Sequence, residues 1–320
     1  MTSIAVTGGA GLIGSYLVDQ LVSAGHNVVV VDDFSKGRLE NLSQVAGKCE
    51  VREGNLEDKG FATEALAGAE TVYHLASRAY GVGYSAAHHL DMLEHNERIT
   101  NNVLQAVRHA GVKNLMVTSS SCVHRDDASD TVPELPLFDG EPEMVNWGYG
   151  WAKRFLEQKA VIYAAETGIN LTIVRPFNIY GERYNWMGEY SQAIPMLVKR
   201  VLDGNDPVVI WGSGNQSRNY LHARDCATVM RRLVEIGYTT GPVNIGLRET
   251  VTMNQLVALI CKAGGLSPKI EHDLTKPEGR FVKSSDETLL TTVLPEFQPS
   301  VSLEDGMKLM VGWYRATFGE

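Results

Sequence analysis

The chain has 320 residues and a formal net charge of −9, with 29 Lys and Arg against 38 Asp and Glu. A chain of this length buries about three quarters of its unfolded surface, so one large α/β domain and two lobes sharing a core are both compatible with it. The negative charge argues against a nucleic-acid or anionic-membrane partner. No apolar run reaches the length of a membrane helix, and no leader precedes the first strand, so we expect a cytoplasmic protein. The cysteines at 49, 122, 226 and 261 are far apart and lack histidine partners, which predicts neither a metal site nor a disulfide framework.

Short β-rich runs alternate with segments of helical period, which is typical of an α/β fold with a parallel sheet covered on both faces. In chain order, we expect strands at 3–7, 27–31, 49–52, 71–75, 114–118, 170–175 and 242–245, and helices at 12–24, 95–110 and 150–167. Gly25, Gly111 and Gly168 follow these helices, where a left-handed stop is expected. Later segments hold more Gly, Pro, Trp and Arg. We therefore predict a Rossmann-type doubly wound sheet as a dinucleotide-binding domain, with a smaller C-terminal substrate-binding lobe. The expected bounds are 1–177 with 221–248 for the first, and 178–220 with 249–320 for the second.

Gly8, Gly11 and Gly14 follow the first apolar run at a spacing that is typical of a dinucleotide-binding turn. Gly8 allows a tight turn, Gly11 lets the backbone approach a pyrophosphate, and Gly14 lets the next helix lie close to the strand. The free N–H groups and positive dipole end of that helix favour phosphate. The second apolar run ends in Asp32 and Asp33, which are expected to accept hydrogen bonds from ribose hydroxyls and to repel a 2′-phosphate. The segment therefore predicts NAD rather than NADP as the cofactor.

Tyr149 and Lys153 are four residues apart, which places them on one face of a helix. A cation near a phenol favours the phenolate, so we expect Lys153 to lower the pKa of Tyr149 and make it a proton acceptor. The hydroxyl run 118–121 directly follows the strand expected at 114–118. These hydroxyls are therefore expected at the carboxyl end of the sheet, where nicotinamide and substrate should meet.

Motifs along nearly the whole chain together resemble one family. They are Gly8-x-x-Gly11-x-x-Gly14, His74-Leu75-Ala76, the serine run, Tyr149-x-x-x-Lys153, Arg175-Pro176-Phe177-Asn178-Ile179-Tyr180-Gly181, Trp211-Gly212-x-Gly214 with Arg218, Asp225, and Lys276-Pro277-x-Gly279-Arg280. The chain is similar to extended short-chain dehydrogenase/reductases of the NAD-dependent nucleotide-sugar epimerase and dehydratase type. Segments 81–84 and 119–123, with Asn96, are most similar to GDP-mannose 3,5-epimerase, whereas 211–214, 221–222 and 276–279 are closer to GDP-fucose synthase.

The resemblance implies a nucleotide-diphosphate sugar as substrate and a redox-neutral reaction with tightly held NAD. Tyr149 would take the proton of a sugar hydroxyl, usually at C4, while Ser120 hydrogen-bonds to the same oxygen and Lys153 holds the nicotinamide ribose. The transient 4-keto sugar can then be reduced on its other face, or can first exchange a proton at C3 or C5. The cofactor-binding residues implied are Gly8, Gly11, Leu12, Ile13, Gly14, Asp32, Asp33, Asn55, Leu56, Leu75, Ala76, Ser77, Asn96, Thr118, Tyr149, Lys153 and Pro176.

Cys122 stands where both relatives carry a cysteine, which suggests an acid or base; the alternative is a small apolar residue packed at a strand end. The second acid/base residues of the relatives are missing. Met187 stands where the 3,5-epimerase has lysine, and Gln192 stands where the fucose synthase has histidine. His124 can replace them if the strand continues past Cys122, or the enzyme inverts C4 and needs no such base.

Arg218 and Arg280 match family positions that bind the diphosphate and nucleotide, and the arginine fork suits phosphate. Asn178 matches a position that contacts the diphosphate or the sugar. Candidates for the rest of the substrate site are Arg78, Tyr84 and Ser120 near the sugar, and Trp211 against the base.

Two other functions stay open. A net nucleotide-sugar 4-dehydrogenase or 4-keto reductase would need added nicotinamide cofactor for turnover. A non-catalytic NAD-sensing protein would show no turnover, and the presence of Ser120, Tyr149 and Lys153 argues against it. By analogy with the family, we also expect a homodimer formed through two long helices.

Overall fold

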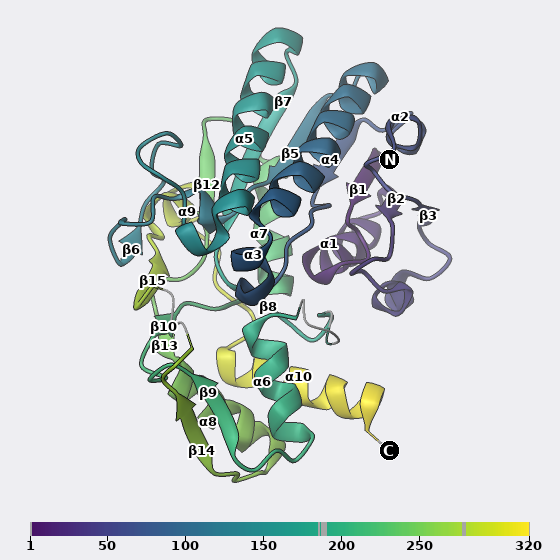
Figure 1. Cartoon of the computed structure of the whole chain (residues 1–320). Coiled ribbons are helices and arrows are strands. Elements are labelled where there is room, and N and C mark those ends of the chain that lie inside the picture. The colour runs from purple at the N-terminus through teal and green to yellow at the C-terminus, as the bar shows by residue number, and fades with distance from the viewer. Residues whose placement is uncertain (1, 185, 187–190, 277–279, 320) are drawn as a thin grey trace.

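The computed structural model describes residues 2–184, 186, 191–276 and 280–319. Its centre is a seven-stranded sheet with the order β12-β7-β5-β4-β1-β2-β3, in which every neighbouring pair is parallel (Figure 1). The strands are β1 (Ser3–Thr7), β2 (Asn27–Asp32), β3 (Glu50–Glu53), β4 (Thr71–His74), β5 (Asn114–Thr118), β7 (Asn170–Pro176) and β12 (Pro242–Ile245). Each corresponds to a strand that the sequence predicts, within one or two residues, and the predicted Rossmann-type α/β fold is confirmed.

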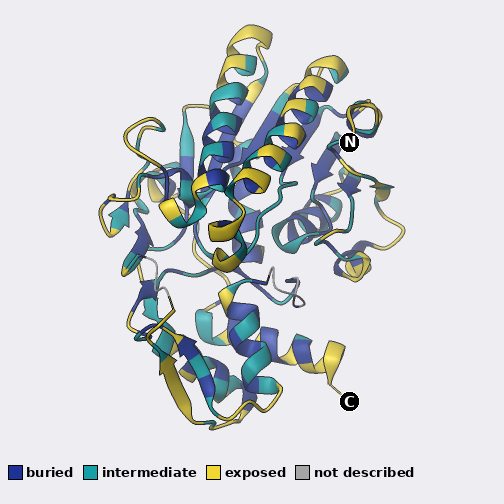
Figure 2. Ribbon diagram, viewed as in Figure 1, coloured by how far each residue is buried: buried dark blue, intermediate teal, exposed yellow. Residues whose placement is uncertain are grey.

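The strands form a sheet because their apolar side chains can be buried on both faces, as parallel sheets require. Val6 and Val30 pack into one core with helices α1 (Leu12–Ser23) and α7 (Ala223–Glu235). Alternate residues such as Ala5 and Val31 pack into a second core. That core is shared with helices α2 (Lys59–Ala65), α4 (His89–Ala110) and α5 (Trp147–Thr167). Figure 2 shows the central strands buried between helices whose outer faces are exposed.

The long helices end where the sequence predicts. Gly111 and Gly168 take left-handed conformations, with φ of 66° and 72°, at the ends of α4 and α5. Gly25 has a φ of 84° and follows the last turn of α1. The start of α4 differs from the prediction, because the helix begins at His89 and adds residues of which Leu90 is exposed and Met92 is buried.

A smaller body, built around a third core, lies below the sheet in Figure 1. Its helices are α6 (Ala193–Leu202), α8 (Met253–Gly264) and α10 (Leu303–Phe318), and its two-stranded sheet pairs β14 (Ile270–Asp273) with β9 (Val208–Trp211). Helix α9 (Thr288–Val293) instead packs Leu290 and Leu294 into the core that contains α1 and α7. The division of the chain into two domains at the expected bounds stays a prediction.

A four-stranded sheet joins the two bodies. Its order is β13 (Val251–Thr252), β10 (Ser217–Arg218), β15 (Val282–Ser285) and β6 (Thr131–Val132). Strand β6 lies in the segment between β5 and α5, and it pairs in parallel with β15. A further pair joins β8 (Ile179–Tyr180) to β11 (Leu221–His222), and a short helix α3 (Val82–Ala87) precedes α4.

Among the described residues, no helix is both long and apolar enough to cross a membrane. The same part of the chain holds no group of three His, Cys, Asp or Glu side chains arranged to bind a metal ion.

Candidate active site

A cavity of about 800 Å³ lies between the carboxyl ends of the sheet strands and the smaller body. One wall consists of residues that follow β1, β2, β4, β5 and β7, and the other comes from α6, β9, β10 and β15. The residues that the sequence assigns to the cofactor, the substrate or catalysis line this cavity, apart from Asn96, Tyr84 and the alternative base His124. Segments that are far apart in the chain therefore meet in one place.

The glycine turn forms a cradle at the base of the cavity. Gly8 has a φ of 68°, and a Cβ on it would lie 2.8 Å from the backbone nitrogen of Ala76. A Cβ on Gly14 would lie 2.1 Å from the carbonyl oxygen of Gly8, so the close approach of α1 to β1 requires glycine. Gly11 begins α1 without a capping side chain. The first-turn N–H groups thus face the cavity with the positive end of the helix, which fits a pyrophosphate.

The two acids after β2 differ in their surroundings. Both carboxylate oxygens of Asp32 accept backbone hydrogen bonds, from Ala10 at 2.9 Å and from Phe34 at 2.9 Å. Asp32 is 7% exposed, and burial raises its pKa although these two hydrogen bonds oppose the shift. Both acids line the cavity, and their assignment to the ribose hydroxyls stays a prediction. Asp32 also braces the glycine turn, and Asp33 is the more accessible acid of the pair.

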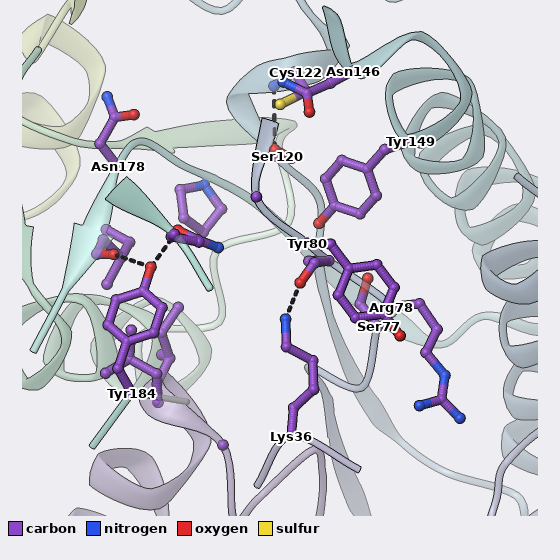
Figure 3. A pocket seen from close by; sticks show the side chains of 18 of the residues that line it. Lys36, Ser77, Arg78, Tyr80, Ser120, Cys122, Asn146, Tyr149, Asn178 and Tyr184 are labelled. Atoms are coloured by element: carbon purple, nitrogen blue, oxygen red, sulfur yellow. Dashed lines mark hydrogen bonds between the residues drawn. The ribbon is translucent and has the colours of Figure 1, made fainter. Parts of the chain in front are cut away.

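Arg78, which the sequence suggests for the sugar pocket, lines the cavity beside Asp33, the residue that follows β2. Its Nη2 is 2.9 Å from Asp33 Oδ2, and its Nη1 donates to Ser35 Oγ at 2.6 Å. Asp33 Oδ1 also accepts from the backbone nitrogen and the hydroxyl of Ser35. The guanidinium therefore spans from the loop after β4 to the loop after β2, at the side of the cavity that fits the cofactor (Figure 3).

Asn96 and Tyr84 lie behind the cavity wall. Asn96 accepts hydrogen bonds from Ser77 Oγ at 2.8 Å and from the Arg78 backbone at 3.0 Å, and donates to two carbonyl groups. It holds the loop after β4 in place rather than facing a ligand. The ring of Tyr84 packs against Tyr80 and stacks on His88, with centroids 4.7 Å and 4.1 Å apart.

The expected catalytic residues converge from two elements. Ser120 follows β5, while Tyr149 and Lys153 lie one turn apart on α5. The Tyr149 hydroxyl points into the cavity (Figure 3), and the hydroxyls of Ser77 and Ser120 lie close enough to favour its ionised form. Lys153 is buried, donates to the Thr118 carbonyl at 2.8 Å, and has its Nζ 5.5 Å from the centre of the Tyr149 ring.

The ionisation of this pair differs from the expectation. Burial raises the pKa of Tyr149, and the nearby Cys122 adds to the rise. Burial also lowers the pKa of Lys153 to about 7, although Glu157 opposes the shift. The reason is geometric, because the ammonium is directed to the Thr118 carbonyl and lies against the ring of Tyr149, not at its hydroxyl. The phenol is therefore protonated at neutral pH in this arrangement.

Cys122 is half-buried and lies in a cluster that the sequence does not reveal. Its thiol lies close enough to the carboxylate of Glu143 for that charge to raise the thiol pKa, and both oxygens of Glu143 lie 3.1 Å from Lys283 Nζ. Glu143 and Lys283 are buried and line the cavity. They lie far apart in the chain and in no recognisable motif, so sequence spacing offers no signal for the pair.

His124 does not join this cluster. The strand ends at Thr118, and residues 121–123 form a 3₁₀ turn, so the condition under which His124 would face the site is not met. Its ring is buried, lies 3.2 Å from Asn244 Oδ1 and packs on Phe177. Met187 lies outside the described residues, while Gln192 lines the cavity and accepts a hydrogen bond from Tyr184.

Three cations gather on the substrate side of the cavity. Arg218 and Lys283 are opposite each other in the parallel pairing of β10 with β15, and Arg280 lies just before β15. Arg280 donates to the carbonyls of Ala128 and Ser129 at 2.5 and 2.9 Å. Asn178 donates to Asn219 at 2.9 Å, and Trp211 is 39% exposed with Lys276 over its ring. Pro277 and Gly279 of the same motif lie outside the described residues.

Comparison with known proteins agrees with this geometry. The family model "NAD dependent epimerase/dehydratase family" matches residues 4–246. UDP-N-acetyl-alpha-D-glucosaminuronate decarboxylase from Bacillus cytotoxicus is 30% identical over 316 residues, covering 97% of each chain. GDP-mannose 3,5-epimerase 1 from Oryza sativa subsp. japonica is 28% identical over 98% of this chain and 81% of its own.

Solved structures of epimerases are also similar to this chain. UDP-glucose 4-epimerase from Thermotoga maritima, solved with UDP-glucose, aligns with a TM-score of 0.84 at 28% identity over 99% of both chains. UDP-N-acetylglucosamine 4-epimerase from Methanobrevibacter ruminantium aligns with a TM-score of 0.87 at 25% identity over 99% of both chains. The protein therefore belongs to the NAD dependent epimerase/dehydratase family of extended short-chain dehydrogenase/reductases, whose cofactor is NAD.

Proposed function

We propose that the protein is a nucleotide-sugar epimerase that uses tightly held NAD and works through a transient 4-keto sugar. The observation that carries the proposal is the meeting of Ser120, Tyr149 and Lys153 in one cavity, between a glycine cradle and a group of cations. When bound, NAD supplies the acceptor for a hydride from C4 and later returns it. The residues of the chain then transfer the proton of the C4 hydroxyl and bind the sugar.

Tyr149 exchanges the proton of the C4 hydroxyl. In its protonated form it can return a proton to the 4-keto oxygen, and Ser120 supports the same oxygen through its hydroxyl. The reverse step needs the phenolate, which a positive charge stabilises. Lys153, with its ammonium 5.5 Å from the ring centre, supplies such a charge when protonated.

Arg218 and Arg280 support a diphosphate-linked substrate. The chain carries a net charge of −9, so a local group of cations facing a cavity calls for an anionic ligand. Guanidinium forks bind phosphate oxygens in pairs, as a nucleoside diphosphate requires. GDP-linked sugars are the first substrates to test, because relatives named GDP-mannose 3,5-epimerase and GDP-L-fucose synthase match 97–98% of the chain. UDP-linked sugars are the second, because the T. maritima 4-epimerase was solved with UDP-glucose.

The decisive experiment omits added cofactor. The purified protein is incubated in deuterated water with GDP-, UDP-, ADP- and dTDP-sugars, and the products are followed by NMR. Isomer without deuterium indicates inversion at C4, while isomer with deuterium at C3 or C5 indicates proton exchange with Cys122 as the leading base. Turnover only after NAD(P)(H) is supplied would replace the proposal with a net 4-dehydrogenase or 4-keto reductase. A protein that binds NAD but turns over no sugar would be a sensor.

The assembly is a separate proposal. We infer a homodimer in the cytoplasm, formed through α4 and α5, by analogy with the family. These helices pack against each other on one face of the sheet, and α5 leaves Val161 and Ile162 exposed (Figure 1). Light scattering coupled to gel filtration tests it, with a mass near 70 kDa expected for two 35.1 kDa chains and one chain's mass contradicting it.

A further inference from the structure

A buried ion pair inside a substrate cavity needs an explanation beyond stability. Moving Glu143 and Lys283 out of water costs free energy that their attraction only partly offsets, so such a pair contributes little to folding by itself. The two side chains come from different parts of the fold, the turn before α5 and strand β15. Both line the cavity, and both lie beside Cys122.

The carboxylate of Glu143 is held from several sides. Lys283 contacts both oxygens at 3.1 Å, and Asn146 donates to Oε2 at 3.0 Å. The Glu143 backbone nitrogen also donates to the Cys122 carbonyl at 3.3 Å, which fixes the two residues against each other. A carboxylate this well fixed keeps its negative charge beside the thiol.

The groups around Cys122 favour the thiol over the thiolate. The negative charge of the neighbouring Glu143 carboxylate opposes a second negative charge on the sulfur. Lys283 acts in the opposite direction but more weakly, and Ser120 also favours the thiolate. Cys122 also interacts electrostatically with Tyr149 and Lys153, which line the same cavity. With burial as the largest cause, the pKa of Cys122 rises to about 12.

We propose that Glu143 is a positioning residue that keeps the Cys122 thiol protonated and thereby restricts the enzyme to inversion at C4. This inference rests on the proposed epimerase function and narrows it. Removal of a proton from C3 or C5 of a 4-keto sugar needs a basic group near that carbon. A thiol that a fixed neighbouring carboxylate keeps protonated is not such a base. The ion pair with Lys283 keeps Glu143 charged and in place.

The first test measures the thiol and needs no sugar. The purified protein is alkylated with iodoacetamide between pH 6 and 10, and each cysteine is quantified by peptide mass spectrometry. Glu143→Gln keeps the shape of the side chain but removes its charge, so Cys122 should react about tenfold faster at pH 8, as expected for a pKa lower by about one unit. Lys283→Met should slow the alkylation of Cys122, because the negative charge of Glu143 then acts on the thiol without the opposing positive charge of Lys283.

The chain contains its own controls. Cys49 and Cys261 are half-buried outside the cavity and should react equally in all variants. Cys226 is fully buried, and it should stay unmodified wherever the variant is folded. An unchanged rate and pH profile for Cys122 in a folded Glu143→Gln protein would overturn the proposal.

The second test measures whether the Glu143→Gln variant gains proton exchange at C3 or C5. With a nucleotide sugar that the enzyme turns over, Glu143→Gln should incorporate deuterium from the solvent at C3 or C5, whereas the unmodified enzyme should not. Adding Cys122→Ala should abolish this incorporation, because the base has been removed. Deuterium incorporation by the unmodified enzyme would contradict the restriction to C4. If no sugar is turned over, the epimerase proposal fails, while the alkylation profile still decides the role of Glu143.

Discussion

Arg175 and Glu157 form a two-point ion pair beneath the catalytic residues. Arg175 Nε and Nη2 each lie 2.9 Å from one oxygen of Glu157, and both side chains are about 2% exposed. Ser119 donates to the same carboxylate, and Arg175 Nη1 donates to the Leu135 carbonyl. The pair ties β7, α5 and the turn after β5 together. It therefore sets the distance between Ser120 and Lys153 without facing the cavity.

Replacing Glu157 with Gln should destabilise the protein by about 3–5 kcal/mol, because a buried guanidinium loses its counter-charge. Chemical denaturation of the two proteins measures the difference. Glu97→Gln is the control, since Glu97 pairs with Lys159 at a partly exposed position and should change stability by less than about 1 kcal/mol. A Glu157→Gln protein as stable as the unmodified one would mean that the pair is dispensable for the fold.

Tyr149→Phe should lose about 10²–10⁴-fold in kcat with no loss of bound NAD, because only the proton-transferring hydroxyl is removed. Turnover is followed by NMR, and NAD is measured in the supernatant after the protein is denatured. The ring still packs against Lys153 in this variant. Normal turnover would remove Tyr149 from the assigned role.

Arg218→Ala should raise KM for the nucleotide sugar about 10- to 100-fold and leave the NAD content unchanged, because charge-assisted hydrogen bonds to a diphosphate are lost. Initial rates across a range of substrate concentrations give KM. Arg248→Ala is the matched control, since this arginine is 64% exposed and lies outside the cavity. Equal KM values for both variants would place the diphosphate elsewhere.

Asp33→Ser should allow NADP to bind. The Asp33 carboxylate accepts from Arg78 at 2.9 Å and from the Ser35 backbone at 3.0 Å, and these donors also suit a phosphate. Removing the carboxylate frees them and ends its repulsion of a 2′-phosphate, so NADP affinity should rise roughly 10- to 100-fold. Mass spectrometry of the cofactor released on denaturation gives the NADP to NAD ratio. Adding Arg78→Ala should reverse the gain in NADP affinity. If the gain persists in the double variant, Arg78 does not bind the 2′-phosphate.

Glu182 should make stability depend on pH in the acid range. Burial alone would raise its pKa, but hydrogen bonds from His222 and Tyr16 lower it to about 2. A depressed folded-state pKa contributes stability above the unfolded value of about 4.5, and the contribution is lost as pH falls toward 2. A shift of this size corresponds to about 3 kcal/mol.

The test compares the unmodified protein with Glu182→Gln by denaturation between pH 7 and pH 3. The gap in unfolding free energy should be largest at pH 7 and should shrink below pH 4.5. The exposed Glu304→Gln serves as the control and should show a small gap at every pH. A gap for Glu182→Gln that does not vary with pH would mean that the loss reflects packing rather than charge.

The seven strands of the large sheet could be predicted because each is a short apolar run that parallel pairing buries on both faces, as in Val28–Val31. Glycine at a left-handed position marked the ends of α4 and α5. The start of α4 was missed because its apolar residues are not all buried: Leu90 is 65% exposed, while Met92 packs into the fold.

In the site too, local sequence patterns predict some residues, whereas others are brought together only by tertiary packing. Residues within one turn or helix, such as Gly8 to Gly14 and Tyr149 with Lys153, can be placed from the sequence. Their spacing along the chain fixes their relative positions through the local geometry of the turn or helix. Glu143 and Lys283 meet only because β15 pairs with β6, which no local pattern encodes. Asn96 matched a family position, but its hydrogen-bonding capacity serves the loop after β4.

The pairing of β6 with β15 limits how this protein can be recombined with its relatives. Ser284 pairs with Thr131 and Ser285 with Val132, so a strand of the smaller body is completed by the segment that also carries Ser120. A chimaera cut between residues 177 and 178 would separate β15 from its natural partner and would place a foreign strand beside Lys283. Exchange of substrate preference between family members therefore requires residues 119–146 to travel with the smaller body, although they lie in the N-terminal half of the chain.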